Sequence, residues 1–185
     1  MRIVAGTARG RKIEAPAGDR TRPTLDRVRE NLFNMLQGYI DNSTILDLFA
    51  GSGALSFEAI SRGASLAVLV DSDRKAYEIQ NKNAEHLGFT DRISCYCCDW
   101  HRAVPDLYKR NFIFDIIFLD PPYAITDMTD VFNFLIPVMT PNTILILEHQ
   151  TGKHPLVPEQ FEIIKQRSWG FCSVNFYRLS AKEEK

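Results

Sequence analysis

The sequence of 185 residues is long enough for one domain with a substantial core, and its 45% hydrophobic and 24% charged residues are typical of globular proteins. No apolar run approaches the roughly 20 residues of a membrane span, and the N-terminus has no apolar signal core, so we expect a cytoplasmic protein. The net charge of −1 gives no overall sign of a polyanionic partner, but residues 1–30 carry a net charge of +4 and the remainder therefore −5.

Residues 1–20 differ from the rest of the chain in charge and pattern. Ile3, Ala5 and Ile13 alternate weakly with glycines and basic residues, which predicts a small β-hairpin with a basic face over residues 1–14. We therefore divide the chain into a basic hairpin extension, residues 1–20, and a main domain, residues 21–185. The positive charge of the extension favours a local contact with a polyanion; a solvated terminus is the alternative.

The next elements are read from hydrophobic period. Val28, Leu32, Met35 and Leu36 recur at helical spacing after Thr24, a predicted N-cap, and Gly38 ends that helix. From residue 44 onward, apolar strands predicted at 44–49, 66–71, 92–98, 114–120 and 143–149 alternate with helices predicted at 53–62, 73–87, 101–109 and 127–139. Repeated strand–helix units predict a mainly parallel α/β sheet with helices on both faces.

The C-terminal part breaks this alternation, because residues 161–169 and 171–180 read as two strands joined through Gly170. This pattern predicts an antiparallel hairpin added to the parallel sheet. Cys95, Cys97 and Cys98 have the spacing of neither a disulfide framework nor a metal site, and the four histidines show no metal spacing either. We expect the three cysteines to line a buried strand in a reducing compartment, and we expect no metal.

Four acidic residues end, or nearly end, four successive predicted strands: Asp47, Asp71, Asp99 and Asp120. Each alone could be a helix cap or turn residue, but ligands of open α/β sheets bind along this carboxyl edge. Residues 50–53, Ala-Gly-Ser-Gly, form a glycine loop after the first strand. The third glycine of a dinucleotide fingerprint is replaced by Ser56, which favours a cofactor without a pyrophosphate.

The stretch Asp120-Pro121-Pro122-Tyr123 follows a buried strand, and two prolines cannot continue its hydrogen-bonded ladder. The chain therefore leaves the sheet in a stiff turn that presents a carboxylate, a free Pro121 carbonyl and an aromatic ring. These three groups suit a planar base with an exocyclic amino group. The alternative is an ordinary strand-ending turn.

Asp47-Leu-Phe-Ala-Gly-Ser-Gly53, with Asp71, Asp99 and the Asp-Pro-Pro-Tyr stretch, resembles the class I S-adenosylmethionine-dependent methyltransferases that act on exocyclic amino groups. Residues 1–6, Arg9-Gly-Arg11, residues 21–30 and Ser61-Arg-Gly-Ala64 resemble the RsmD family more closely. This resemblance covers essentially the whole chain, with Ser56 as a departure from the family glycine. It implies a Rossmann-like fold with a mainly parallel seven-stranded sheet, and N2 methylation of a guanine in bacterial small-subunit (16S) rRNA.

Carried over to this sequence, the resemblance implies three groups of site residues. Asp120, Pro121, Pro122 and Tyr123 would hold the target base, with acceptors on its amino group and a stacking ring. S-adenosylmethionine would be held by Thr24, Asp47, Ala50, Gly51, Ser52, Gly53, Asp71, Ser72, Asp99 and Trp100. RNA phosphates would be contacted by Arg2, Arg9, Arg11, Lys12 and Arg22.

Two other functions stay open. A DNA adenine-N6 methyltransferase can share the Asp-Pro-Pro-Tyr stretch, but this chain has no room for a separate target-recognition region. A non-catalytic RNA-binding assembly factor could use the same scaffold, although the intact site residues argue against degeneration. The expected partner is small-subunit rRNA or the assembled small ribosomal subunit, bound by a monomer without membrane or metal.

Overall fold

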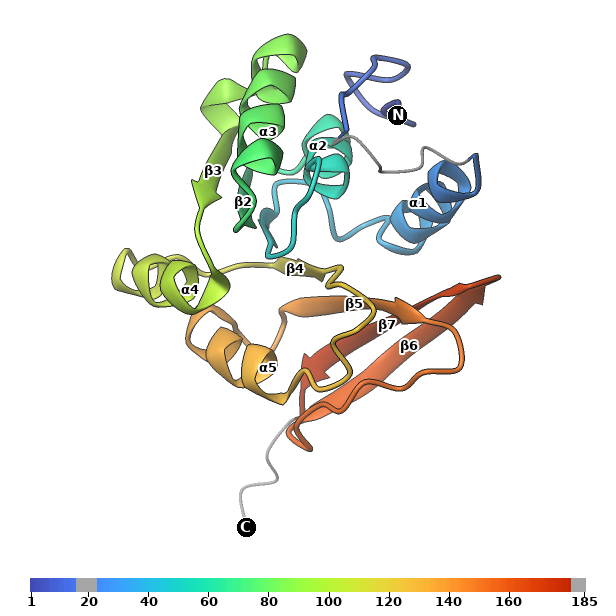
Figure 1. Cartoon of the computed structure of the whole chain (residues 1–185), viewed down its shortest axis with the longest axis vertical. Helices are drawn as coiled ribbons and strands as arrows, with labels where there is room; N and C mark the ends of the chain where they lie inside the picture. Colours follow the sequence, from blue (N-terminus) through green and yellow to red (C-terminus); the bar gives the residue numbers. More distant parts are fainter. Residues whose placement is uncertain (16–22, 181–185) are drawn as a thin grey trace.

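One sheet with helices on both faces forms the centre of the molecule (Figure 1). The computed structural model describes residues 1–15 and 23–180, with residues 23–26 described in the backbone only. Seven strands lie in the order β3-β2-β1-β4-β5-β7-β6. The predicted Rossmann-like α/β class and its seven-stranded sheet are confirmed.

Five strands run parallel, and a hairpin closes one edge. The parallel strands are β1 (Thr44–Asp47), β2 (Leu66–Asp71), β3 (Ile93–Cys97), β4 (Ile116–Leu119) and β5 (Ile144–Gln150). β7 (Cys172–Leu179) pairs antiparallel with β5 and with β6 (Phe161–Trp169), as the missing helix between the last two strands predicted. The apolar runs of β1, β2 and β4 are buried because helices cover both faces there.

The helices divide between the two faces of the sheet. α1 (Pro23–Met35), α2 (Ala54–Ser61) and α3 (Arg74–Leu87) cover one face, where they share a core that includes Phe33, Phe57 and Leu87. α4 (Trp100–Lys109) and α5 (Thr129–Leu135) cover the other, with Leu107 and Phe132 in the second core. Two 3₁₀ turns, η1 (Thr90–Arg92) and η2 (Ile136–Val138), complete the elements. Because the helices cover the two faces of the sheet, the carboxyl ends of the parallel strands remain available for a binding site.

Helix ends follow local chemistry. Asp73 caps α3 by accepting a hydrogen bond of 2.9 Å from the Lys75 N–H, and Gly88 ends it in the left-handed conformation. The predicted N-cap at Thr24 is wrong, because α1 begins one residue earlier, at Pro23, and proline is favoured in the first helical turn. The helix predicted at 127–139 is shorter, since Pro137 lacks an N–H and the chain tightens into η2.

Residues 1–15, here called the N-terminal arm, form a hairpin-like loop rather than two paired strands. A single antiparallel bridge joins Arg2 and Lys12. Left-handed glycines at positions 6 and 10 turn the chain before a longer ladder can form. Ile3, Ala8 and Ile13 are buried in the core that α1, α2 and α3 share, so the arm packs against the domain.

The expectation for the cysteines is wrong in part. β3 is an edge strand, and Cys95 and Cys98 are half-buried while Cys97 is exposed. An apolar run does not distinguish a central strand from an edge strand, which explains the error. In residues 1–15 and 23–180 no group of three His, Cys, Asp or Glu residues could hold a metal ion. Among the helices of the same described part, none is long and apolar enough to cross a membrane.

Candidate active site

A cavity of about 520 Å³ lies at the carboxyl ends of β1, β2, β4 and β5. Its wall combines the glycine loop, the strand ends, α1 and the N-terminal arm, and its size is that of a small-molecule site. The lining residues are Met1, Val28, Arg29, Leu32, Asp47, Phe49, Ala50, Gly51, Ser52, Ala54, Leu55, Asp71, Ser72, Asp120, Pro121, Pro122, Tyr123 and Glu148.

Most of the predicted site residues meet in this cavity. It brings together Asp47, Ala50, Gly51, Ser52, Asp71, Ser72 and residues 120–123. Gly53, Asp99 and Trp100 lie outside its lining. Arg22 and the side chain of Thr24 lie outside the described residues. Val28 and Arg29 belong to residues 21–30, a segment that the family resemblance implies closes over the cofactor. Met1 and Leu32 were missed, because only the folded chain brings the start of the N-terminal arm and the second half of α1 to the strand ends.

The glycine loop is fixed by side chains on both sides. One Asp71 oxygen accepts from the Gly51 N–H at 2.8 Å and the other from the Asp73 N–H at 2.9 Å. Gln80, buried on α3, donates to the Gly51 carbonyl at 2.9 Å. Asn83, also buried on α3, donates to the Ser52 carbonyl at 3.3 Å and to the Glu14 carbonyl at 3.0 Å. The loop is therefore held in one conformation by the protein itself.

Asp47 lines the cavity and is only 1% exposed. Burial raises its pKa to about 7, and the nearby charge of Asp71 acts in the same direction. The Ser56 hydroxyl opposes this shift by donating a hydrogen bond of 2.8 Å. A cationic group placed in the cavity would favour the ionised form of Asp47. Ser56 thus supports the acid rather than lining the cavity.

Gly53 serves packing at the start of α2. It has a φ of +78°, and a Cβ at this position would lie 2.7 Å from side-chain atoms of Leu69 and Phe57. Only glycine combines that conformation with so close an approach of the helix to β2. The contacts of Gly53 therefore support a role in packing α2 against β2.

The Asp-Pro-Pro-Tyr turn begins directly after β4. The Ile125 N–H donates to the Pro122 carbonyl at 2.9 Å, whereas no backbone N–H of the described residues donates to the Pro121 carbonyl. Tyr123 is 41% exposed, and its hydroxyl donates to Glu148 Oε1 at 3.0 Å. Burial, reinforced by the charge of Glu148, raises the pKa of Tyr123, so its hydroxyl stays protonated.

Asp99 and Trp100 lie at the start of α4 instead. Asp99 is the N-cap and accepts from the His101 N–H at 2.8 Å, a bond that holds the pKa of its carboxyl below the usual value. Trp100 stacks on the His101 ring with centroids 3.4 Å apart and meets Phe134 edge-on. The helix-cap alternative for Asp99 thus describes its contacts in this structure.

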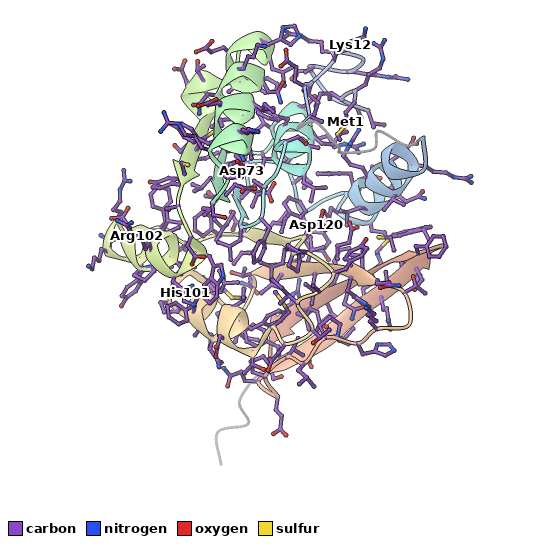
Figure 2. All side chains as sticks on the ribbon, viewed as in Figure 1. Met1, Lys12, Asp73, His101, Arg102 and Asp120 are labelled. Atoms are coloured by element: carbon purple, nitrogen blue, oxygen red, sulfur yellow. The ribbon has the colours of Figure 1, made fainter. Side chains whose placement is uncertain are left out.

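The basic residues of the N-terminal arm have different environments. Arg11 donates to the carbonyls of His86 and Leu87 at the end of α3, and Arg2 donates to the Gly10 carbonyl. Arg9 and Lys12 are exposed. Figure 2 shows Lys12 at the end of the molecule beyond Met1, well away from Asp120. A polyanion that touched both Lys12 and the cavity would have to lie along the arm.

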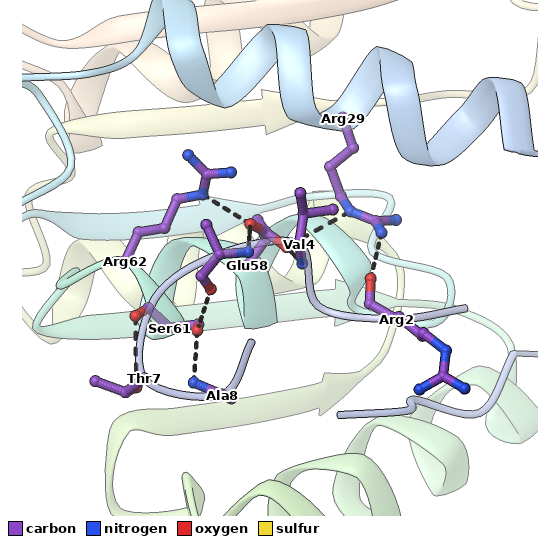
Figure 3. Close-up of polar contacts among 9 residues, drawn as sticks. Arg2, Val4, Thr7, Ala8, Arg29, Glu58, Ser61 and Arg62 are labelled. Atoms are coloured by element: carbon purple, nitrogen blue, oxygen red, sulfur yellow. Dashed lines mark hydrogen bonds and ion pairs between the residues drawn. The ribbon is translucent and has the colours of Figure 1, made fainter. Parts of the chain in front are cut away.

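A buried acid that the sequence analysis missed fixes the arm. Glu58 on α2 is fully buried and accepts from the Val4 N–H at 2.7 Å and the Ala5 N–H at 3.0 Å (Figure 3). It also pairs with Arg62 at 2.7 Å and with Arg29 at 3.7 Å. Arg29 comes from α1, lines the cavity and donates to the Arg2 carbonyl. One carboxylate therefore ties the arm and α1, two parts of the cavity wall, to α2.

The comparisons with known proteins agree with this architecture. The model of the family described as conserved hypothetical protein 95 matches residues 1–178. The chain is 32% identical to the Ribosomal RNA small subunit methyltransferase D of Haemophilus influenzae, over 96% of this chain and 93% of that protein. It is 32% identical to the protein of the same name from Escherichia coli K12, over 100% and 92%. The solved structure of the yhhF protein of Escherichia coli matches with a TM-score of 0.82 and 32% identity, over 98% and 99%.

Proposed function

This chain belongs to the conserved hypothetical protein 95 family, the RsmD family, and from that premise we propose that it methylates the exocyclic N2 of a guanine in bacterial small-subunit (16S) rRNA with S-adenosylmethionine. Relatives that match nearly its whole length carry the name of a small-subunit rRNA methyltransferase. The observation that carries the proposal is the meeting of the Asp-Pro-Pro-Tyr turn, the glycine loop and two strand-end acids in one cavity.

The cavity fits the cofactor in its donor and acceptor groups. Each Asp71 oxygen accepts one backbone hydrogen bond and keeps a lone pair, which suits the two hydroxyls of a ribose. Asp47, a buried acid with a raised pKa, suits the cationic amino group of the methionine part. Ala50, Gly51, Ser52 and Ser72 line the space between them. When bound, S-adenosylmethionine supplies an electrophilic methyl group on its sulfonium.

The turn after β4 suits the target base. The guanine N2 lone pair is delocalised into the ring, so the amino group is a poor nucleophile. Asp120 and the Pro121 carbonyl would accept its two hydrogens, bias the nitrogen toward sp³ geometry and aim its lone pair into the cavity. Tyr123 would stack on the base, which must leave its RNA context to enter.

The partners follow from the same proposal. Arg9 and Lys12 are exposed and suit phosphate contacts that fix the position of the RNA without reading its sequence. Arg2, Arg11 and Arg22 belong to the same proposed set, with Arg2 and Arg11 also bonded within the protein. The substrate would be rRNA or the assembled small subunit, met in the cytoplasm by a monomer.

The test is transfer of labelled methyl from S-adenosylmethionine to protein-free small-subunit rRNA, assembled small subunits and duplex DNA, with identification of the product nucleoside. The RNA must come from cells that lack this enzyme. N2-methylguanosine is expected. Methylated adenine in DNA, or cofactor binding without transfer to any substrate, would contradict the proposal and favour one of the two other functions.

Asp120→Ala tests the role of the turn. It removes an acceptor for the amino group but no group assigned to the cofactor, so transfer should fall about 10²–10³-fold while cofactor affinity stays unchanged. Asp130→Ala, at an exposed acid in the first turn of α5, is the matched control and should retain full activity. Undiminished turnover of Asp120→Ala would refute the role.

A further inference from the structure

A second carboxylate lies beside the Asp-Pro-Pro-Tyr turn. β4 and β5 are parallel neighbours, and their last paired residues are Leu119 and Leu147. The residue that follows each of these leucines is an acid, Asp120 after Leu119 and Glu148 after Leu147. Both line the cavity, so two carboxylates stand side by side at the carboxyl edge where the base would enter. The sequence places Glu148 near the edge of the sheet, but its position beside Asp120 depends on the strand register, which only the structure gives.

Glu148 is held in place rather than loosely exposed. It belongs to β5, is half-buried, and receives the Tyr123 hydroxyl on Oε1 at 3.0 Å. It also borders a smaller hollow that adjoins the cavity and shares Pro121, Pro122 and Tyr123 with it. A carboxylate has about four lone-pair sites, so the bond from Tyr123 leaves Glu148 able to accept from a ligand.

We propose that Glu148 is a specificity-determining residue that accepts a hydrogen bond from N1–H of the target guanine. The inference rests on the proposed function and deepens it, because it names the group that identifies the base. Asp120 and the Pro121 carbonyl would then accept hydrogen bonds from the two N2 hydrogens. Glu148 would accept from N1–H, the third donor on the same edge of the base.

The chemistry of the purines explains why an acid suits this position. Guanine presents adjacent N1–H and N2–H₂ donors, whereas adenine presents an unprotonated N1 acceptor beside its amino group. A carboxylate facing N1 attracts the first base and repels the second. A site built to hydrogen-bond one donor rejects analogues that lack it, because its own polar group is then left unpaired. The second acid therefore favours guanine over adenine as the substrate.

A purely positional role for Glu148, through Tyr123, makes different predictions. Glu148→Gln keeps the size of the side chain and an oxygen that can accept from Tyr123, but it replaces one acceptor oxygen by an NH₂ donor. Tyr123→Phe removes the hydroxyl contact and leaves the carboxylate. Comparing the two variants therefore separates reading of N1 from support of Tyr123.

The experiment uses the rRNA substrate with either guanine or 2-aminopurine at the methylated position. 2-Aminopurine keeps the 2-amino group, but its N1 is an acceptor. Wild-type protein should methylate guanine and strongly disfavour 2-aminopurine. In Glu148→Gln, the rate of guanine methylation should fall by about 10–100-fold. The preference ratio, which is the rate with guanine divided by the rate with 2-aminopurine, should fall by at least about tenfold. Tyr123→Phe should slow both substrates by a similar factor.

The outcomes separate this inference from the function on which it rests. If wild-type protein methylates no guanine, the proposed function itself fails. If it methylates guanine but Glu148→Gln leaves the preference ratio unchanged, Glu148 does not read N1 and the inference is overturned. The inference is equally overturned if Tyr123→Phe narrows the ratio as much as Glu148→Gln, since Glu148 would then act through Tyr123.

Discussion

The substitution Glu58→Gln tests how the N-terminal arm is attached to the domain. Glutamine has the size of glutamate, so it leaves no cavity. It removes the negative charge between Arg29 and Arg62, whose side chains are 5% and 17% exposed. It also turns one of the two oxygens that accept from Val4 and Ala5 into an NH₂ group, which would face a backbone N–H.

The expected cost is large because Glu58 is fully buried. Removing one partner of a buried ion pair costs about 3–5 kcal/mol, since the remaining charge stays buried and uncompensated. One backbone N–H left without an acceptor would by itself cost about 1–3 kcal/mol. The two effects overlap, so we expect the free energy of unfolding to fall by about 3–5 kcal/mol. That is a large share of the roughly 5–15 kcal/mol of a whole domain.

Urea denaturation followed by circular dichroism measures this change. Glu78→Gln is the matched control, because Glu78 pairs with Arg74 on α3 with both side chains exposed and should cost less than about 0.5 kcal/mol. Limited proteolysis should also cut the N-terminal arm faster in Glu58→Gln than in the control. A loss of less than about 1 kcal/mol in Glu58→Gln would refute the reasoning, since a buried charge cluster cannot be lost so cheaply.

Three further predictions concern the glycine loop, the buried acid and the basic arm. Gly53→Ala should lower the free energy of unfolding by about 2–4 kcal/mol, because it adds steric overlap to the strain of a left-handed backbone. Gly88→Ala is the control: Gly88 has a φ of +72° but open space around it, so only the strain of about 1–2 kcal/mol is expected. Equal losses of stability in denaturation would contradict the packing role of Gly53. Because the pKa of Asp47 is about 7 in the folded protein against 3.8 ordinarily, the folded state holds the proton longer, so this residue lowers stability as pH rises from about 4 to 7. In urea denaturation, the free energy of unfolding of Asp47→Asn relative to wild type should therefore increase as the pH rises from 5 to 8. A difference between the two proteins that does not change with pH would refute the raised pKa of Asp47. Arg9→Gln with Lys12→Gln should weaken rRNA binding and reduce the slope of log affinity against log salt by about 1.4–1.8, measured by filter binding, while Arg102→Gln with Lys109→Gln on α4 should leave the slope unchanged. A slope that did not change in the arm variant would mean that the arm is merely solvated.

The fold could be predicted because the sequence repeats one simple signal. Apolar runs ended by glycine or aspartate gave the strands from residue 44 onward, and each lies within a few residues of its predicted range. The errors occurred where the pattern of apolar residues carries no information about the structure. The period of residues 92–98 cannot show that β3 is at the edge, so the exposure of Cys97 was missed. Nor does alternation show that glycines at positions 6 and 10 interrupt a ladder.

The candidate site was predictable where chemistry coincides with strand ends, as for Asp47, Asp71 and Asp120. It was not predictable where residues act across long separations in sequence. Glu58 meets the arm more than 50 residues away, and its only sequence signal is that it is the one charged residue of α2. Asp99 also follows a strand and caps α4, so its predicted contact with the cofactor stays a prediction.

The position of Met1 has a practical consequence for handling the protein. Met1 lines the cavity, and its carbonyl accepts from the Ile13 N–H, which fixes the start of the arm beside the cavity. A purification tag fused before Met1 would therefore emerge beside this cavity, where the proposed RNA substrate would enter. β7, in contrast, runs antiparallel to β5 and carries the chain to the opposite edge of the sheet. A tag placed after the last residue, or one that is cleaved before assay, is the safer choice for every experiment described above.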